Sequence, residues 1–388
     1  MIRKLSIKSF KSLLDVEIEL GRINVFVGAN GSGKSNLLEA LGVLGAAASG
    51  RVDSGALSSR GVRLGLPVIY KSSFRGTTTR TSIGFEASSE DAAFAVELLN
   101  PLKEPAPAWA FKNEALSESG KRVQGRSPAS VQRLRPDLGW IARWAVELAP
   151  ERPAARLLEE LAAYCIYAPD TRTLRSLVPD IHTGNPVGLA GGRLPEAVRE
   201  LLHFAPDQLQ ELLALIGWAD AVEVRKAGAE VPLSPWVPRA GEILLFRDRY
   251  MGDRRNSLTG YDASEGALYV LFAAALALLP DAPPVFAIDN VDQGLNPRLA
   301  RAFIQQLCGW VLDAADRQVL MTTHNPLVLD GLPLDDDEVR LFAVGRSRKG
   351  RTTVTRIKVD LNQLQRDGEL WTVSRLWVMG HLGGMPDV

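Results

Sequence analysis

Apolar residues repeat at two different periods within the first part of the chain. Residues 5–7 and 16–20 alternate apolar with polar side chains, which predicts two β-strands. A short apolar run at residues 23–27 predicts a third strand. A glycine-rich turn follows it, and residues 36–44 then show helical spacing. Strand, glycine loop and helix in this order indicate an α/β layer architecture.

The rest of the chain contains further strand and helix patterns. Strands show short apolar runs bounded by turn residues, whereas the helices show Leu, Ala and Val at three- and four-residue spacing. The predicted elements are two strands around a turn within 68–85, helices at 138–167 and 194–219, and strands at 241–246, 285–288, 318–321 and 339–344.

The middle of the chain departs from this order. Residues 100–136 are rich in Pro, Lys, Ser, Gly and Arg, which predicts a surface loop that is partly mobile. The apolar run at 267–279 is shorter than the ~20 residues that a membrane helix needs, so it predicts a buried core helix. We therefore expect one body made of residues 1–95 and 241–388. A mostly helical insertion is expected at residues 96–240.

The composition is that of an ordinary globular protein. Of the 388 residues, 46% are hydrophobic and 23% are charged. The formal net charge is zero, so no overall basic field indicates a nucleic-acid partner. Cys165 and Cys308 are the only cysteines, which argues against a disulfide framework and fits a reduced compartment. Because the N-terminus also lacks the apolar stretch of a secretory signal, we expect a cytoplasmic protein without membrane contact.

The glycine-rich turn matches the phosphate-binding pattern G-x-x-x-x-G-K-[ST] in full, and it has the required context between a strand and a helix. Glycines let backbone N–H groups turn toward phosphates, and the start of the helix adds a positive dipole end. Lys34 is expected to reach the β- and γ-phosphates, and the Ser35 hydroxyl to ligate Mg²⁺. The expected nucleotide-binding residues here are Gly28, Ala29, Asn30, Gly31, Ser32, Gly33, Lys34, Ser35 and Asn36.

Further stretches occur in a fixed order around this loop. The opening "IRKLSIKSFKSLLDVEIEL…INVFVGANGSGKSNLLEAL" is followed by "YDASEGALYVLFAAALALL", "VFAIDNVDQGLNP" and "VLMTTHNPLVLD". These stretches resemble the first lobe, the signature helix, the second carboxylate motif and the switch-histidine strand of ABC-type ATPases of the SMC, RecF and OLD group. The resemblance covers roughly residues 1–45 and 258–330. It implies an ABC-type ATPase head with a mixed sheet and bound ATP and Mg²⁺.

The resemblance also implies a homodimer that closes head to tail around two nucleotides. In such a dimer Ser264 and Gly266 would touch the γ-phosphate held by the partner's phosphate loop, because a hydroxyl and a bare backbone at a helix start suit an anion. Their residue types alone are also explained by a plain helix N-cap at Ser264.

Three more site residues follow from the resemblance. Asp289 would hold Mg²⁺ together with Ser35, through water. His324 would sense the γ-phosphate, although a structural role also explains an isolated histidine. Lys11 would brace the nucleotide from the N-terminal strand.

The residue after Asp289 departs from the family pattern, which has a glutamate there that takes a proton from the attacking water. Asn290 carries an amide, which cannot accept that proton. Since a positioned base contributes about 10²–10⁴-fold, we expect either slow hydrolysis with a long-lived ATP dimer or hydrolysis activated by a partner. Asp292 and, across the dimer, Glu265 are substitute bases, and drift at a redundant position is the alternative. The family's Gln loop is also missing, because no glutamine precedes Gln124.

Partners are predicted mainly from the resemblance. Only about 55 residues follow the switch strand, too few for the TOPRIM nuclease domain of many OLD-like proteins. We therefore expect a stand-alone ATPase that gates a separate effector, a nuclease or TOPRIM-like protein, in anti-phage defence. The alternatives are a nucleotide-gated binding module with incidental turnover and a RecF-like repair ATPase that loads on duplex DNA.

Two basic clusters are candidate contacts with the nucleic-acid backbone. Because the chain has zero net charge, a solvated turn is the favoured explanation of each cluster. The first cluster, in a predicted hairpin turn, is Arg346, Arg348, Lys349 and Arg351. The second, in the predicted loop, is Lys121, Arg122, Arg126, Arg133 and Arg135.

Overall fold

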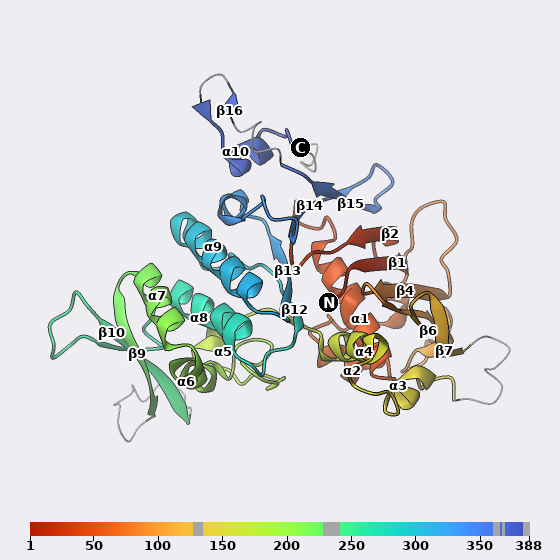
Figure 1. Cartoon of the computed structure of the whole chain (residues 1–388), viewed down its shortest axis with the longest axis horizontal. Helices are drawn as coiled ribbons and strands as arrows, with labels where there is room; N and C mark the ends of the chain where they lie inside the picture. Colours follow the sequence, from red (N-terminus) through yellow and green to blue (C-terminus); the bar gives the residue numbers. More distant parts are fainter. Residues whose placement is uncertain (127–134, 228–240, 360–364, 367–368, 383–388) are drawn as a thin grey trace.

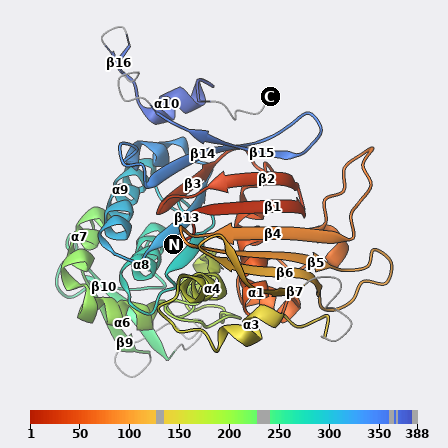
Figure 2. The ribbon, with the colours of Figure 1, turned by 45° about the vertical axis from the view of Figure 1, so that its right-hand side comes forward.

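The computed structural model describes residues 1–126, 135–227, 241–359, 365–366 and 369–382. Two six-stranded sheets form its centre, and helix α1 (Lys34–Ala48) packs between them (Figures 1 and 2). The fold is a mixed α/β architecture, as the sequence predicts.

The first sheet is antiparallel, with strand order β2-β1-β4-β5-β6-β7. Its strands are β1 (Lys4–Phe10), β2 (Leu13–Glu19), β4 (Ser82–Ser88), β5 (Ala92–Leu99), β6 (Ala110–Glu118) and β7 (Lys121–Arg126). Buried and more exposed positions alternate along β4 and β5. This period of two arises because one face of the sheet packs on the core and the other faces water.

The second sheet is mixed, with strand order β15-β14-β3-β13-β12-β8. Its strands are β3 (Ile23–Val27), β8 (Cys165–Tyr167), β12 (Val285–Ile288), β13 (Gln318–Thr323), β14 (Val339–Arg346) and β15 (Thr352–Ile357). Only β15 runs antiparallel to its neighbour. Every residue of β3, β12 and β13 is buried, because other elements cover both faces of the sheet.

Two hydrophobic cores lie on the two sides of the second sheet. In one, Leu37 and Leu41 of α1 pack with Phe85 of the first sheet and Leu320 of the second. In the other, α8 (Glu265–Leu278) and α9 (Pro297–Asp313) cover the opposite face. α6 (Leu194–Phe204) packs on α8, and α7 (Pro206–Ile216) packs on both α8 and α9. A three-stranded sheet lies beside α6 and α7; it consists of β9 (Ala219–Lys226), β10 (Glu242–Asp248) and β11 (Ser257–Thr259).

Short elements complete the described chain. They are α2 (Ser54–Ser58), η1 (Pro67–Tyr70), α3 (Trp140–Ala145), α4 (Pro153–Ala163), α5 (Thr171–Leu174), η3 (Pro326–Gly331), β16 (Gln365–Arg366), β17 (Glu369–Leu370) and α10 (Val373–Val378).

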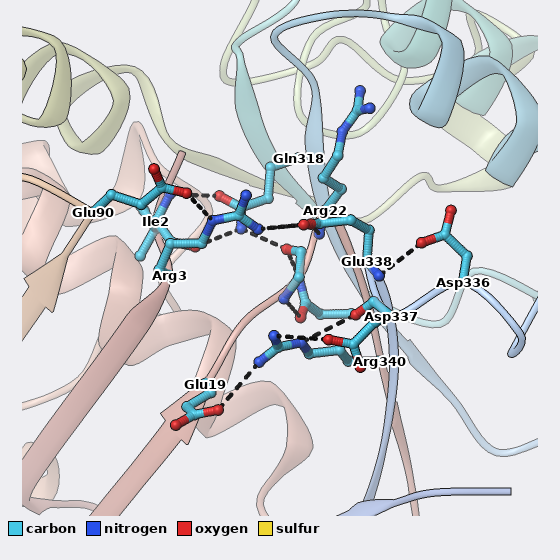
Figure 3. Close-up of polar contacts among 12 residues, drawn as sticks. Ile2, Arg3, Glu19, Arg22, Glu90, Gln318, Asp336, Asp337, Glu338 and Arg340 are labelled. Atoms are coloured by element: carbon cyan, nitrogen blue, oxygen red, sulfur yellow. Dashed lines mark hydrogen bonds and ion pairs between the residues drawn. The ribbon is translucent and has the colours of Figure 1, made fainter.

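A polar network joins the N-terminal strands to the second sheet (Figure 3). The fully buried amide of Gln318 accepts a hydrogen bond from the backbone N–H of Ile2 at 3.0 Å. It donates to the carbonyls of Ile2 and Gly21, each at 2.7 Å. Beside it, Arg3 forms an ion pair with Glu338 at 2.6 Å. A buried amide whose two ends are both satisfied fixes how two elements meet, so this network sets the position of β3 against β13.

Two predictions for the first half of the chain are wrong. Residues 68–85 hold one strand, β4, and the expected first strand is the 3₁₀ helix η1, which begins at Pro67. Within the predicted loop at 100–136, residues 110–126 form β6 and β7. β6 is hydrogen bonded to β5, and β7 is hydrogen bonded to β6, a pairing that the loop-like composition did not reveal. Arg133 and the rest of the predicted mobile segment at 127–134 lie outside the described residues.

The two long predicted helices are interrupted. Residues 138–167 form α3, α4 and β8, and residues 194–219 form α6 and α7. Pro153 and Pro206 each begin a new helix, because proline is favoured in the first turn and disfavoured in a helix interior.

The other predicted elements are confirmed, namely the helix after the glycine turn, the buried helix at 267–279 and the strands that begin near 241, 285, 318 and 339. The division at residues 95 and 241 stays a prediction. Among the described residues, we find no helix with the length and apolar character that crossing a membrane requires.

Candidate nucleotide-binding site

Three neighbouring parallel strands end at the same edge of the second sheet. These strands are β3, β13 and β12, in that spatial order. The phosphate loop follows β3, His324 follows β13, and Asp289 follows β12. Because parallel strands present their carboxyl ends together, side chains from three distant parts of the sequence meet here.

The phosphate loop is packed so closely that two of its glycines have no room for a side chain. A Cβ on Gly28 would lie 2.1 Å from the carbonyl oxygen of Val344. Gly33 has φ 111°, and a Cβ there would lie 2.3 Å from Oγ1 of Thr352. That hydroxyl donates to the carbonyl of Ser32 at 2.7 Å. The β14–β15 hairpin therefore supports the loop from behind, a contribution that the motif alone did not reveal.

Lys34 is buried, and its ammonium group is held by groups of the protein. Nζ donates to the carbonyls of Gly28 and Ala29 at 2.8 and 3.0 Å, and it lies 3.2 Å from Nδ1 of His324. Burial lowers the pKa of Lys34 to about 8, although the nearby carboxylates of Asp289 and Asp292 oppose the shift. The ammonium group is therefore poorly solvated, and an anion bound beside it would stabilise its charged form.

His324 contacts the phosphate-loop lysine directly. Burial, and then the charge of Lys34, lower the pKa of His324 below its ordinary value. The ring is therefore neutral near pH 7, and its Nδ1 can accept from the ammonium group. The structure thus places His324 directly beside the phosphate-loop lysine.

Ser35 and Asp289 also meet, as a shared Mg²⁺ site requires. The Ser35 hydroxyl donates to Oδ2 of Asp289 at 2.9 Å, and Thr322 donates to Oδ1 of the same carboxylate. Among the described residues, no group of three or more His, Cys, Asp or Glu could hold a metal. One carboxylate and one hydroxyl fit Mg²⁺, which keeps several waters and binds substrate phosphates as well. Mg²⁺ would be held by these oxygens and would neutralise phosphate charge.

The backbone at Asn290 gives a local reason for an asparagine. Its φ is 57°, in the left-handed region that Asn tolerates better than most residues. Its N–H donates to Oγ1 of Thr322 at 2.8 Å, which ties the turn to β13. Asp292, the first substitute base, accepts from Oγ1 of Thr323 at 2.6 Å. This hydrogen bond ties Oδ1 of Asp292 to the end of β13.

A cavity of about 580 Å³ opens beside the phosphate loop and includes Lys11 and Asn36. Lys11 forms an ion pair with Glu39 of α1, and so does Arg63, through Nε at 2.5 Å. Asn36 donates to the hydroxyl of Ser12 at 2.8 Å. Sequence reasoning missed Glu39 and Arg63, and a buried glutamate in an apolar helix was the signal that could have found them. The cations and hydrogen-bonding groups that line this cavity are of the kind that bind the polar groups of a nucleotide.

The expected signature residues start helix α8. Ser264 is its N-cap residue, but its side chain makes no cap hydrogen bond. Its hydroxyl instead accepts from Nε1 of Trp218 at 3.3 Å. A Cβ on Gly266 would lie 3.1 Å from the carbonyl oxygen of Gly294, so close packing also explains this glycine. Within the described part of the chain, the Ser264 side chain is thus hydrogen bonded to Trp218 and not to the phosphate loop.

Two segments of the chain match models of known protein families. A model described as "AAA ATPase domain" matches residues 1–58. A second, described as "AAA domain, putative AbiEii toxin, Type IV TA system", matches residues 235–330. These two segments supply the phosphate loop, Asp289 and His324.

The chain is similar to solved SMC heads, and the first of those below shares its overall fold. An SMC head bound to the C-winged helix domain of ScpA has a TM-score of 0.57 and 14% identity, over 94% of this chain and 99% of that chain. An SMC head domain from Thermotoga maritima has a TM-score of 0.47 and 16% identity, over 92% and 99%. An Smc head with an extended coiled coil, bound to the C-terminal domain of ScpA from Pyrococcus furiosus, has a TM-score of 0.49 and 13% identity, over 93% of this chain and 97% of that chain.

Two segments of this chain match AAA ATPase family models, and its fold is similar to that of an SMC head.

The basic hairpin of this ATPase lies against its phosphate loop. Arg346 donates from Nε to the carbonyl of Gly31 at 2.9 Å, and the guanidinium of Arg351 lies 5.9 Å from the ring of Phe74. Arg348 and Lys349 lie in the β14–β15 turn. In the second basic cluster, Arg126 is buried and paired with Glu114 at 3.3 Å, so it is not available to a nucleic acid.

ATP affinity of this ATPase is expected to fall as pH rises above about 8. In the empty site the pKa of Lys34 is about 8, and phosphates would favour its charged form, so binding takes up a proton at higher pH. We expect Kd to rise about tenfold per pH unit between about pH 8.5 and 10, measured by calorimetry at constant ionic strength. Lys34→Arg stays charged throughout and should lose this slope. An equal slope in both proteins would contradict the assignment to Lys34.

Proposed function

We propose that this protein binds ATP with Mg²⁺ at the carboxyl edge of β3, β13 and β12. The observation that supports this most directly is the meeting of Lys34, Ser35, Asp289 and His324 from three strand ends. Lys34 and the loop N–H groups would hold phosphates, and Ser35 with Asp289 would hold Mg²⁺. Lys11 and Asn36 would line the site on the side of the neighbouring cavity.

Two copies would close head to tail around two nucleotides. Ser264 and Gly266 of each copy would contact the γ-phosphate held by the other. An exposed serine hydroxyl that does not cap its own helix supports this role. Hydrolysis would be slow, because the amide of Asn290 cannot act as a base. The ATP-bound dimer would therefore be long-lived, and ATP binding would control dimerisation.

A bulky substitution at Ser264 tests the dimer directly. We expect ATP and Mg²⁺ to double the mass of the wild-type protein in light scattering. Ser264→Arg should stay monomeric with ATP and keep its monomer affinity for nucleotide, because its side chain would occupy the interface. Ser257→Arg, an exposed serine on β11, is the matched control and should dimerise normally. Normal dimerisation of the Ser264 variant would contradict the proposed arrangement.

We further propose that the ATP-bound dimer gates a separate effector protein in anti-phage defence. The family-model description that names a toxin of a toxin–antitoxin system supports this proposal. The product of the neighbouring gene is the first candidate, and it should bind with ATP but not with ADP.

A RecF-like activity on duplex DNA is the second candidate. The contact of Arg346 with the phosphate loop favours it, because this contact would link the basic hairpin to the nucleotide state. DNA binding that depends on ATP and is lost in Arg348→Ala/Lys349→Ala would support it. No binding at low salt would exclude it.

A further inference from the structure

The hydroxyl of Ser264 has an unusual partner for a residue at a helix start. N-cap serines normally accept a hydrogen bond from the second or third N–H of their own helix. Here no such bond forms, and the oxygen accepts from the indole N–H of Trp218, 46 residues earlier in the chain. At the start of α8, the Ser264 side chain therefore forms a tertiary hydrogen bond with Trp218 and no local capping bond.

The chemistry of this contact fixes the direction of the serine proton. An indole N–H is only a donor, so the serine oxygen must be the acceptor. The serine O–H then remains free to donate elsewhere. Ser264 is exposed, so this O–H can point toward an acceptor outside the chain.

Trp218 is itself held firmly. It follows Gly217, whose φ of 83° turns the chain out of α7 and into β9. The carbonyl of Trp218 accepts from the N–H of Arg249 at 3.0 Å. Its ring lies against Phe246, with the centroids 5.5 Å apart. The indole is therefore fixed by the backbone on one side and by the core on the other.

The residues on both sides of Ser264 are also tied to the rest of the protein. Arg175 donates to the carbonyl of Ala263 at 3.0 Å. Thr171 donates to the carboxylate of Glu265 at 2.5 Å. This contact also holds Glu265, the second substitute base, against α5. The backbone at the start of α8 is thus placed before any partner arrives, and only the hydroxyl needs a further constraint.

We propose that Trp218 is a positioning residue for Ser264. Its N–H holds the serine oxygen so that the serine O–H is aimed at the terminal phosphate of the nucleotide bound by a second copy. This inference rests on the proposed ATP-dependent dimer, and it adds a residue that no part of the signature motif contains.

A double-mutant cycle tests the inference. Trp218→Phe keeps a ring against Phe246 and removes the N–H together with part of the ring area, and Ser264→Ala removes the acceptor. We expect Trp218→Phe to weaken ATP-induced dimerisation about tenfold in sedimentation experiments, since each dimer contains two such sites. In the Ser264→Ala background the same change should have no further effect. Melting temperature and monomer affinity for ATP should stay unchanged. Trp144→Phe, a half-buried tryptophan next to the other core, is the matched control.

The possible results separate two failures. If Trp218→Phe leaves dimerisation unchanged while Ser264→Ala weakens it, the positioning role is wrong and the dimer stands. Equal weakening by Trp218→Phe in both backgrounds would also overturn the inference, because its effect would not pass through Ser264. If the wild-type protein does not dimerise with ATP, both the inference and the proposed dimer are wrong.

Discussion

Replacing Lys34 with methionine is expected to remove ATP binding and to leave the empty protein at least as stable as the wild type. The ammonium group would be the main cation for the phosphates, and removing one partner of a buried charge contact costs about 2–5 kcal/mol. We therefore expect Kd to rise at least about 10²-fold in calorimetry. Methionine fills a similar volume, so the loop should keep its packing.

The effect on stability has the opposite sign. The pKa of Lys34 is lowered to about 8, so the empty fold disfavours the charge that the unfolded chain carries freely. The wild-type stability should therefore rise between about pH 8 and 10, as Lys34 loses its proton in the folded state first. Lys34→Met should lack this rise and should be more stable at pH 7, by up to a few kcal/mol. Urea unfolding at both pH values measures this.

Lys8→Met on β1 is the control for both measurements, because that lysine is exposed. It should bind ATP normally and unfold like the wild type. A Lys34→Met protein that binds ATP with unchanged affinity would refute the placement of phosphates in this loop.

Replacing Asn290 with glutamate is expected to raise the steady-state ATPase rate by about 10²-fold or more. A carboxylate there could take the proton that an amide cannot, and a positioned base contributes about 10²–10⁴-fold. The gain would be reduced by backbone strain, because φ at this position is 57°. The left-handed region costs an ordinary residue roughly 1–2 kcal/mol, which should appear as a lower melting temperature.

Asn290→Gln is the matched control. It has the length and the backbone cost of glutamate but no base, so it should melt like Asn290→Glu and hydrolyse ATP as slowly as the wild type. If the two variants have the same rate, the missing carboxylate does not limit hydrolysis. A wild-type rate above several per second would lead to the same conclusion.

The sequence predicted the parts of the site that are contiguous. The run at residues 23–27, the glycine turn and the following helix are local, so their pattern alone was sufficient. The strands predicted at 285–288 and 318–321 were equally clear, because strands buried on both faces are mostly apolar. By contrast, β6 and β7 carry polar side chains, and the pairing of β6 with β5 and of β7 with β6 defines them.

Only the tertiary structure decided which side chains meet. Lys34 contacts His324 across 290 residues of sequence, and Ser35 contacts Asp289 across 254. The sequence around Ser264 does not indicate that Trp218 would donate a hydrogen bond to its hydroxyl oxygen. The physical reason is that local periodicity records how deeply each element is buried, whereas strand order and packing choose its neighbours. The sequence by itself thus determined a phosphate loop on an α/β body, and the folded chain determined the charges and hydrogen bonds around it.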